Sequence, residues 1–262
     1  KTADTQNGYG ANTIGGYQSP LALADSIPNA FMASRRSHYI FQPAIGSFYE
    51  GIQYAHKELL SARDPWSGYI HYDPALQMIA HFSRFAVTGW EKTPDDNPDN
   101  NTIWRMIAGA SHASFGGSDN EHATAGINGD ASYLTLAAPN GEDFSVVFVN
   151  NTQNEKTFKI SVEDLDTAAA KSLQTWVTQT DSYMQKGATV QPGENGGWLV
   201  TIPAYSIVTA TTLDEYQTSE ELAMPADGIR TEDRTVLDTD STGKNADTED
   251  EYLYADDFDY DE

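Results

Sequence analysis

Apolar and polar residues alternate in short runs along the second half of the chain, over residues 103–213. Alternation with a period of two places every second side chain on the same face of an extended strand. Turn dipeptides such as Asn140-Gly141 separate the runs. The pattern predicts an antiparallel β-sandwich over residues 88–213. Its expected strands are residues 132–137, 144–149, 157–162, 173–177, 198–202 and 206–211.

The first third of the chain carries helical patterns instead. Asp73-Pro74 is a helix start signal, and Gly89 is placed to end the helix that follows. A shorter helix is expected over residues 20–27, ending near Pro28 because a proline inside a helix removes a backbone donor. By composition, the Gly- and Asn-rich residues 1–18 are expected to form a loop. The apolar face of the helix after Asp73 consists of Ala75, Met78, Ile79, Phe82 and Ala86.

Composition and charge narrow the possible functions. The formal net charge is −24 over 262 residues, which argues against nucleic acid as a partner. Residues 214–262 hold 18 of the acidic residues against three basic ones, so this segment is expected to be an acidic linker. The absence of Cys excludes disulfides and thiolate chemistry. Because no apolar run is long enough to cross a bilayer, we expect no membrane span.

Aromatic residues in turns are the best candidates for binding chemistry. Trp66 lies in a Pro-Trp-Ser-Gly turn, where its indole face could stack on a sugar while Ser67 or the backbone meets a hydroxyl. The alternative is that Trp66 is a structural residue that packs at the end of the hydrophobic core. Tyr54 could donate its hydroxyl to substrate or pack in a loop. The histidines show no metal-ligand spacing, so we expect neither a metal nor another cofactor.

A retaining glycosidase needs two carboxyl groups roughly 5 Å apart. The acidic residues before residue 90 form no obvious pair in the sequence. Asp4, just before the Gly-rich segment, is a candidate, although a solvated terminal residue is the simpler interpretation.

Several motifs, in order along the chain, resemble those of galactocerebrosidase and its bacterial relatives, glycoside hydrolase family 59. Each motif alone is short, but their order is fairly specific. They are Asn29 to Met32, Phe48 to Glu50, Tyr54, the run Ala62 to Tyr69, Gly89-Trp90, Gly129 to Tyr133, Phe144 to Val149, Pro203 to Thr209 and Tyr254 to Phe258.

The resemblance implies a (β/α)8 barrel, then a β-sandwich, then a lectin-like domain. The chain would begin near the end of the seventh barrel strand. Residues 1–87 would be the C-terminal part of the barrel and residues 88–213 the sandwich. Residues 214–262 would be the acidic linker leading into a truncated lectin-like domain.

The resemblance also implies roles for particular residues. The acid/base Glu of the family has no counterpart in this chain, and Asp4 stands where the family has its nucleophile Glu. Tyr54 matches a Tyr that faces substrate, and Trp66-Ser67 match the family's turn. Two positions depart from the pattern: Gln42 stands in place of a Trp, and a substrate-contacting Arg has no clear match near Lys159.

These implications give a functional expectation. The chain is expected to be part of a retaining β-galactosidase-type hydrolase acting on a carbohydrate or glycolipid, as in sphingolipid metabolism, and inactive alone. A partner chain or a missing segment would supply the rest of the barrel. We expect it to be secreted or in a lysosome-like, extracytoplasmic compartment. The alternatives are a related barrel-plus-sandwich hydrolase acting on galactan or another β-glycan, and a non-catalytic carbohydrate-binding accessory protein.

Overall fold

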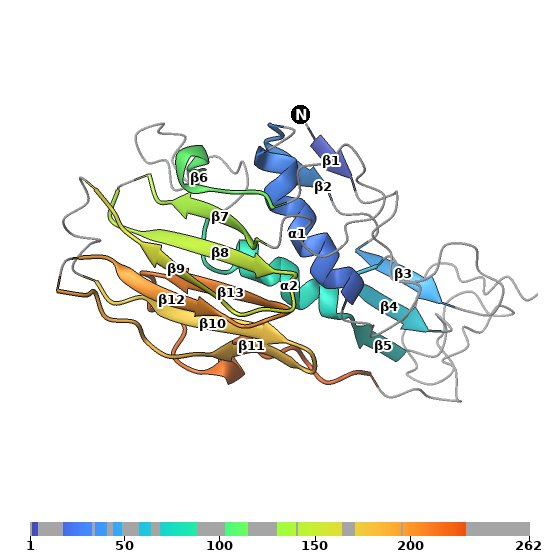
Figure 1. Cartoon of the computed structure of the whole chain (residues 1–262). Coiled ribbons are helices and arrows are strands. Elements are labelled where there is room, and N and C mark those ends of the chain that lie inside the picture. The colour runs from blue at the N-terminus through green and yellow to red at the C-terminus, as the bar shows by residue number, and fades with distance from the viewer. Residues whose placement is uncertain are drawn as a thin grey trace, which may run out of the picture.

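The computed structural model describes most of the chain up to residue 228 (Figure 1). Among these residues, no helix has the length and apolar character needed to cross a membrane. The described residues are 2–4, 18–32, 35–40, 44–48, 58–63, 69–87, 103–114, 130–139, 141–163, 171–194 and 196–228.

The chain begins with a parallel β-α-β unit. Strand β1 (Thr2–Asp4) pairs in parallel with β2 (His38–Ile40), and helix α1 (Gln18–Met32) connects them. Two expectations are therefore wrong. Residues 2–4 form a strand rather than a loop, and α1 continues through Pro28. The helix tolerates the missing backbone donor because its residues from 20 to 30 are buried on nearly every side, so tertiary packing outweighs the local cost.

A three-stranded sheet follows. Strand β3 (Ile45–Phe48) is parallel to β4 (Leu60–Arg63), and β4 is antiparallel to β5 (Tyr69–Tyr72). Helix α2 (Pro74–Ser83) begins where the sequence predicts but ends before Gly89. It ends early because the next residues turn to bury Phe85, whose carbonyl accepts a hydrogen bond from the Ser145 hydroxyl.

The second half of the chain forms two sheets. The larger one has the strand order β11-β10-β13-β8-β7-β6, and the smaller one pairs β12 with β9 (Figure 1). Neighbouring strands are antiparallel throughout both sheets. Three of the predicted strands are confirmed with their predicted bounds, namely β7, β12 and β13. The bounds are β6 (Arg105–Met106), β7 (Ser132–Ala137), β8 (Phe144–Asn150), β9 (Lys156–Ile160), β10 (Gln174–Gln179), β11 (Ser182–Lys186), β12 (Trp198–Ile202) and β13 (Ser206–Thr211).

Two apolar cores lie on opposite faces of the larger sheet. One joins α1 and α2 to β7, β8 and β13, through residues such as Leu21, Met78 and Val147. The other lies between the two sheets, around Trp198 and Phe148. Strands β8 and β13 are therefore covered on both faces, and every residue of each is buried. Strands covered in this way favour continuous apolar runs, as in the segment Val146 to Val149.

The described beginning of the acidic segment packs against the larger sheet. A short 3-10 helix, η5 (Ser219–Leu222), buries Leu222, and the Tyr216 ring contacts Phe85 and Trp176 edge-on. Residues 214–222 are therefore folded rather than an extended linker. Tyr216 and Leu222 supply the apolar contacts that the acidic composition of the segment obscured.

Candidate functional site

The β-α-β unit fixes the position of Asp4. Asp4 is the last residue of β1 and is in register with Ile40, the last residue of β2. In parallel α/β folds, ligands bind beyond the carboxyl ends of the strands. The backbone of Asp4 therefore lies at the edge of the sheet where a barrel enzyme would hold its substrate.

The three predicted sugar-contacting residues, Tyr54, Trp66 and Ser67, lie outside the described residues. Their neighbours in the sequence are described, however. Glu58 follows Tyr54 by four residues, and the segment with Trp66 and Ser67 connects β4 to β5. These neighbours show how the ends of both segments are held.

Glu58 and Asp73 form a buried polar cluster around Ser61. The Ser61 hydroxyl lies 3.0 Å from Oε1 of Glu58 and 2.7 Å from Oδ2 of Asp73. Because a hydroxyl carries one hydrogen, it serves one carboxyl group at a time. Asp73 holds the N-cap position of α2, but its side chain makes no capping hydrogen bond. Gly46 of β3 leaves room for the cluster, since a Cβ there would stand 2.7 Å from the Glu58 carboxyl carbon.

Asp25 is a third buried carboxyl group. It lies on α1 and is 1% exposed, and burial raises its pKa from 3.8 to about 6, although Ser132 of β7 lowers it slightly. Within the described residues, neither carboxyl oxygen makes a hydrogen bond of ordinary geometry. Asp25 faces Ser132 at the start of β7 in the larger sheet.

His81 of α2 is a fully buried core residue. Its two ring nitrogens lie 2.8 Å from the Thr209 and Thr178 hydroxyls of the larger sheet. Burial lowers its pKa to about 3, so the ring is neutral and fastens the helix to the sheet.

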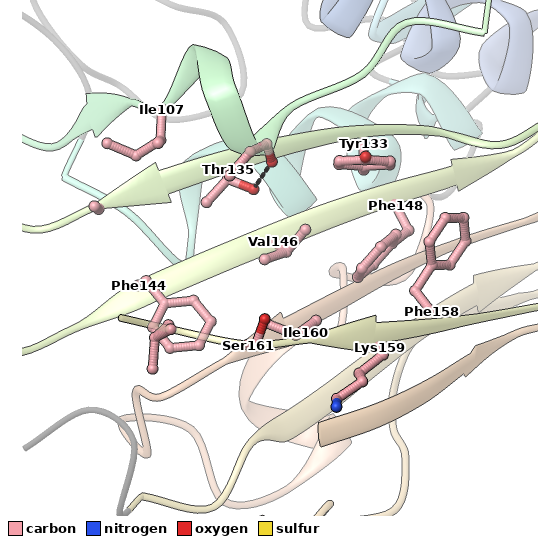
Figure 2. Close-up of a pocket in the computed structure, with 13 residues that line it drawn as sticks. Ile107, Tyr133, Thr135, Phe144, Val146, Phe148, Phe158, Lys159, Ile160 and Ser161 are labelled. Atoms are coloured by element: carbon pink, nitrogen blue, oxygen red, sulfur yellow. Dashed lines mark hydrogen bonds between the residues drawn. The ribbon is translucent and has the colours of Figure 1, made fainter. Parts of the chain in front are cut away.

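A cavity of about 300 Å³ lies between the two sheets (Figure 2). Tyr133, Phe148 and Phe158 gather at one end, and Phe144 lies at the other. Lys159 also lines it, but none of the described lining residues is Asp or Glu. The cavity therefore lacks the carboxyl groups that glycoside hydrolysis requires.

One solved structure is similar in fold, and one family model matches part of the sequence. A glycoside hydrolase family 30 subfamily 8 xylanase from Clostridium acetobutylicum is similar in fold, with a TM-score of 0.50 and 12% identity, over 79% of this chain and 41% of that one. Family 30 enzymes are (β/α)8 barrels, of which this chain matches a portion. Residues 9–84 match the model of glycosyl hydrolase family 59. The family resemblance inferred from the motifs is therefore confirmed over this region.

Two other family 30 structures are similar at lower scores. A xylanase catalytic domain from Talaromyces cellulolyticus has a TM-score of 0.48 and 16% identity, over 80% of this chain and 39% of that one. An endoxylanase from Clostridium papyrosolvens has a TM-score of 0.47 and 15% identity, over 76% of this chain and 39% of that one. The chain thus spans about two fifths of the length of these structures. By sequence, it matches no curated protein.

Proposed function

We propose that the chain is the C-terminal portion of a retaining glycoside hydrolase that resembles galactocerebrosidase. It would cleave β-galactosidic bonds, in galactosylceramide-like glycolipids or in other β-galactosides. The observation that carries this proposal is the family 59 match over residues 9–84, because this region includes Tyr54, Trp66 and Ser67. The position of Asp4 at the carboxyl end of β1 supports it.

The exposed face of β2 supports the proposal that further barrel strands adjoin this chain. Parallel strands are ordinarily covered on both faces, yet Ile40 at the end of β2 is 51% exposed. We propose that residues 1–87 complete a barrel whose earlier strands come from a preceding segment or a partner chain. Residues 88–213 would be the accessory sandwich, and residues 214–262 would lead to a lectin-like domain.

The proposed mechanism uses one carboxyl group from this chain. Asp4 would attack the anomeric carbon of the sugar and form a covalent glycosyl-enzyme intermediate. A Glu outside this chain would protonate the departing oxygen and then deprotonate the water that releases the sugar. The chemistry requires no metal or other cofactor. The chain alone would be inactive, because it supplies at most one of the two carboxyl groups.

The sugar would rest against Trp66, with Ser67 and Tyr54 meeting its hydroxyl groups. Because Asp is one methylene shorter than Glu, the rest of the site must bring the sugar closer to Asp4. A displacement of about 1 Å can change a rate about a hundredfold. The expected location is secreted or lysosome-like, which agrees with the acidic character of the chain.

A second candidate substrate is another β-glycan, such as galactan or xylan. The fold similarity to a family 30 xylanase favours this candidate. In this case the residue roles are unchanged and only the sugar differs. If the assay below detects no turnover, the remaining candidate is a non-catalytic accessory protein. Such a protein would bind sugar through Trp66 without cleaving it.

The test is an assay of the longer protein that contains this chain, using aryl β-galactoside and aryl β-xyloside substrates. We expect Asp4→Asn to reduce kcat by at least about a thousandfold, as removal of a nucleophile does, and Trp66→Ala mainly to raise KM. Asp130→Asn is the matched control, because Asp130 is an exposed aspartate far along the sequence from this region. Unchanged turnover in Asp4→Asn would reject Asp4 as the nucleophile.

A further inference from the structure

The carboxylate of Asp227 binds three of the four residues of β5. Its Oδ2 lies 2.7 Å from Nδ1 of His71 and accepts a hydrogen bond of 3.1 Å from the Tyr69 hydroxyl. Its Oδ1 accepts a hydrogen bond of 3.3 Å from the backbone N–H of Tyr72. About 155 residues separate the two sides of this contact in the sequence, so it joins distant parts of the chain.

The backbone next to Asp227 also meets β5. The N–H of Gly228 donates a 2.9 Å hydrogen bond to the carbonyl of Ile70. Since β4 pairs with β5 in the three-stranded sheet, this contact places residues 227–228 beside β5 as a further strand would lie. In Figure 1 the orange trace leaves the larger sheet and runs toward β5. We call residues 223–228 the strap.

The contact continues inward from His71. Its Nε2 is buried and stands 3.8 Å from Oδ1 of Asp73. Asp73 and Glu58 then share the Ser61 hydroxyl, as described above. A series of polar side chains therefore runs from the partly exposed Asp227 to the buried Glu58. His71 lies between the carboxyl groups of Asp73 and Asp227.

Hydrogen bonding keeps Asp227 ionised. Burial raises its pKa, but the hydrogen bonds from His71, the Tyr72 backbone and Tyr69 outweigh burial, and the pKa is lowered overall. A carboxylate that accepts several hydrogen bonds is held in a defined orientation. Asp227 is thus an exposed carboxylate whose orientation is fixed by hydrogen bonds from β5.

The series of polar groups joins the described ends of both segments with predicted sugar contacts. Glu58 lies at the end of the segment that contains Tyr54. Strands β4 and β5, which carry Ser61 and His71, border the segment that contains Trp66. Contacts that hold β5 and Glu58 in place therefore also hold described residues that flank the segment with Tyr54 and the segment with Trp66.

We propose that Asp227 is a positioning residue for the sugar site, acting through His71 and β5. This inference rests on the proposed function. The strap ties the chain that follows β13 to β5, so that sugar affinity depends on the contact between Asp227 and β5.

The first experiment measures the strap itself. Asp227→Asn is nearly isosteric, but it replaces a carboxylate oxygen that faces two hydrogen-bond donors. In this chain, amide hydrogen exchange of peptides covering residues 69–73 should speed up by about tenfold in the variant, the size expected for one lost charge-assisted hydrogen bond. Asp130→Asn should leave the exchange unchanged. Unchanged exchange in Asp227→Asn would overturn the proposal.

The second experiment measures sugar affinity in the longer protein. Asp227→Asn and His71→Gln should each raise KM about tenfold with kcat within about twofold, and the double variant should be no worse than either alone. Loss of folding alone would not raise KM while leaving kcat within about twofold.

The outcomes separate this inference from the proposed function. If Asp227→Asn speeds up exchange but leaves KM unchanged, while Trp66→Ala raises KM, the positioning role is wrong and the sugar site stands. If Trp66→Ala also leaves KM unchanged, the proposed sugar site is wrong, and the positioning role falls with it.

Discussion

Replacing Asp25 by Asn should change how the stability of the protein depends on pH. The native pKa of Asp25 is raised from 3.8 to about 6 by burial. Because the folded chain holds the proton more tightly than the unfolded chain, the protonated carboxyl group contributes stability below about pH 4. This contribution is lost as the pH rises through the folded pKa. Above it, the ionised carboxylate remains buried, and neither oxygen makes a hydrogen bond of ordinary geometry in the described residues.

The magnitude follows from the shift in pKa. A shift of about two units corresponds to about 3 kcal/mol, since each unit is worth about 1.4 kcal/mol. Part of this amount is already lost at pH 4, so a change of about 2 to 3 kcal/mol remains between about pH 4 and pH 8. The amide introduced by Asp25→Asn cannot titrate, so the difference in unfolding free energy between wild type and this variant should change by this amount. The pH-independent cost of burying an amide cancels in the comparison.

Urea unfolding, followed by Trp fluorescence at several pH values, measures the unfolding free energy of both proteins. Asp130→Asn serves as the control, because Asp130 is exposed and its replacement should leave the pH dependence unaltered. If the difference in unfolding free energy between wild type and Asp25→Asn is the same at pH 4 and pH 8, this result refutes the reasoning, because Asp25 then does not hold its proton more tightly in the folded chain than in the unfolded chain.

The remaining predictions concern the packing of the two halves. Because burial lowers the pKa of His81 to about 3, the unfolded chain binds a proton that the folded chain does not, and the unfolding free energy should fall by about 1.4 kcal/mol for each pH unit below about 6.5. His81→Phe should remove this pH dependence, as measured by urea unfolding at pH 4 to 7. Gly197→Ala should destabilise by at least about 2 kcal/mol, because φ is +79° and the new Cβ would press on the carbonyl oxygen of Ile160. Gly109→Ala, with open space around it, should be neutral, and equal melting temperatures for the two glycine variants would contradict this contrast. Asn150→Leu should cost about 2 to 4 kcal/mol in thermal unfolding, since the two hydrogens of the Asn150 side-chain amide are shared among three backbone carbonyls; a loss below about 0.5 kcal/mol would show that water replaces these bonds.

The strands of the second half could be predicted where apolar side chains that contact the core recur along the strand, as in β12 and β13. β12 alternates strictly between buried and exposed residues, and its bounds were predicted correctly. β11 was missed, because Ser182–Lys186 is mostly polar and its conformation depends on pairing with β10. Positive φ values at Asp181 and Met184 shape this hairpin without any Gly to signal it. Local pattern therefore identifies a strand only when the strand itself contacts the core.

Long-range contacts explain what the sequence could not predict at the site. Asp73 was expected to cap α2, but its carboxyl group accepts from Ser61, which is twelve residues earlier. Asp227 looked like one more charge in an acidic segment, because its partners lie some 155 residues away. The assignment of Asp4 came from family motifs and not from spacing. The roles of Asp73 and Asp227 depend on which distant segments of the chain come into contact. Residue type alone does not show which segments these are.

The core that joins α1 and α2 to the larger sheet has a consequence for the inheritance of this architecture. Leu21, Met78 and Val147 belong to one apolar cluster, although they come from the two halves of the chain. A gene fusion that kept only one half would leave its share of this cluster open to water, and the product would aggregate. The sheet therefore cannot be exchanged between enzymes as a detachable module. Changes in one half must be matched by changes in the other, so we expect the two to have diverged together.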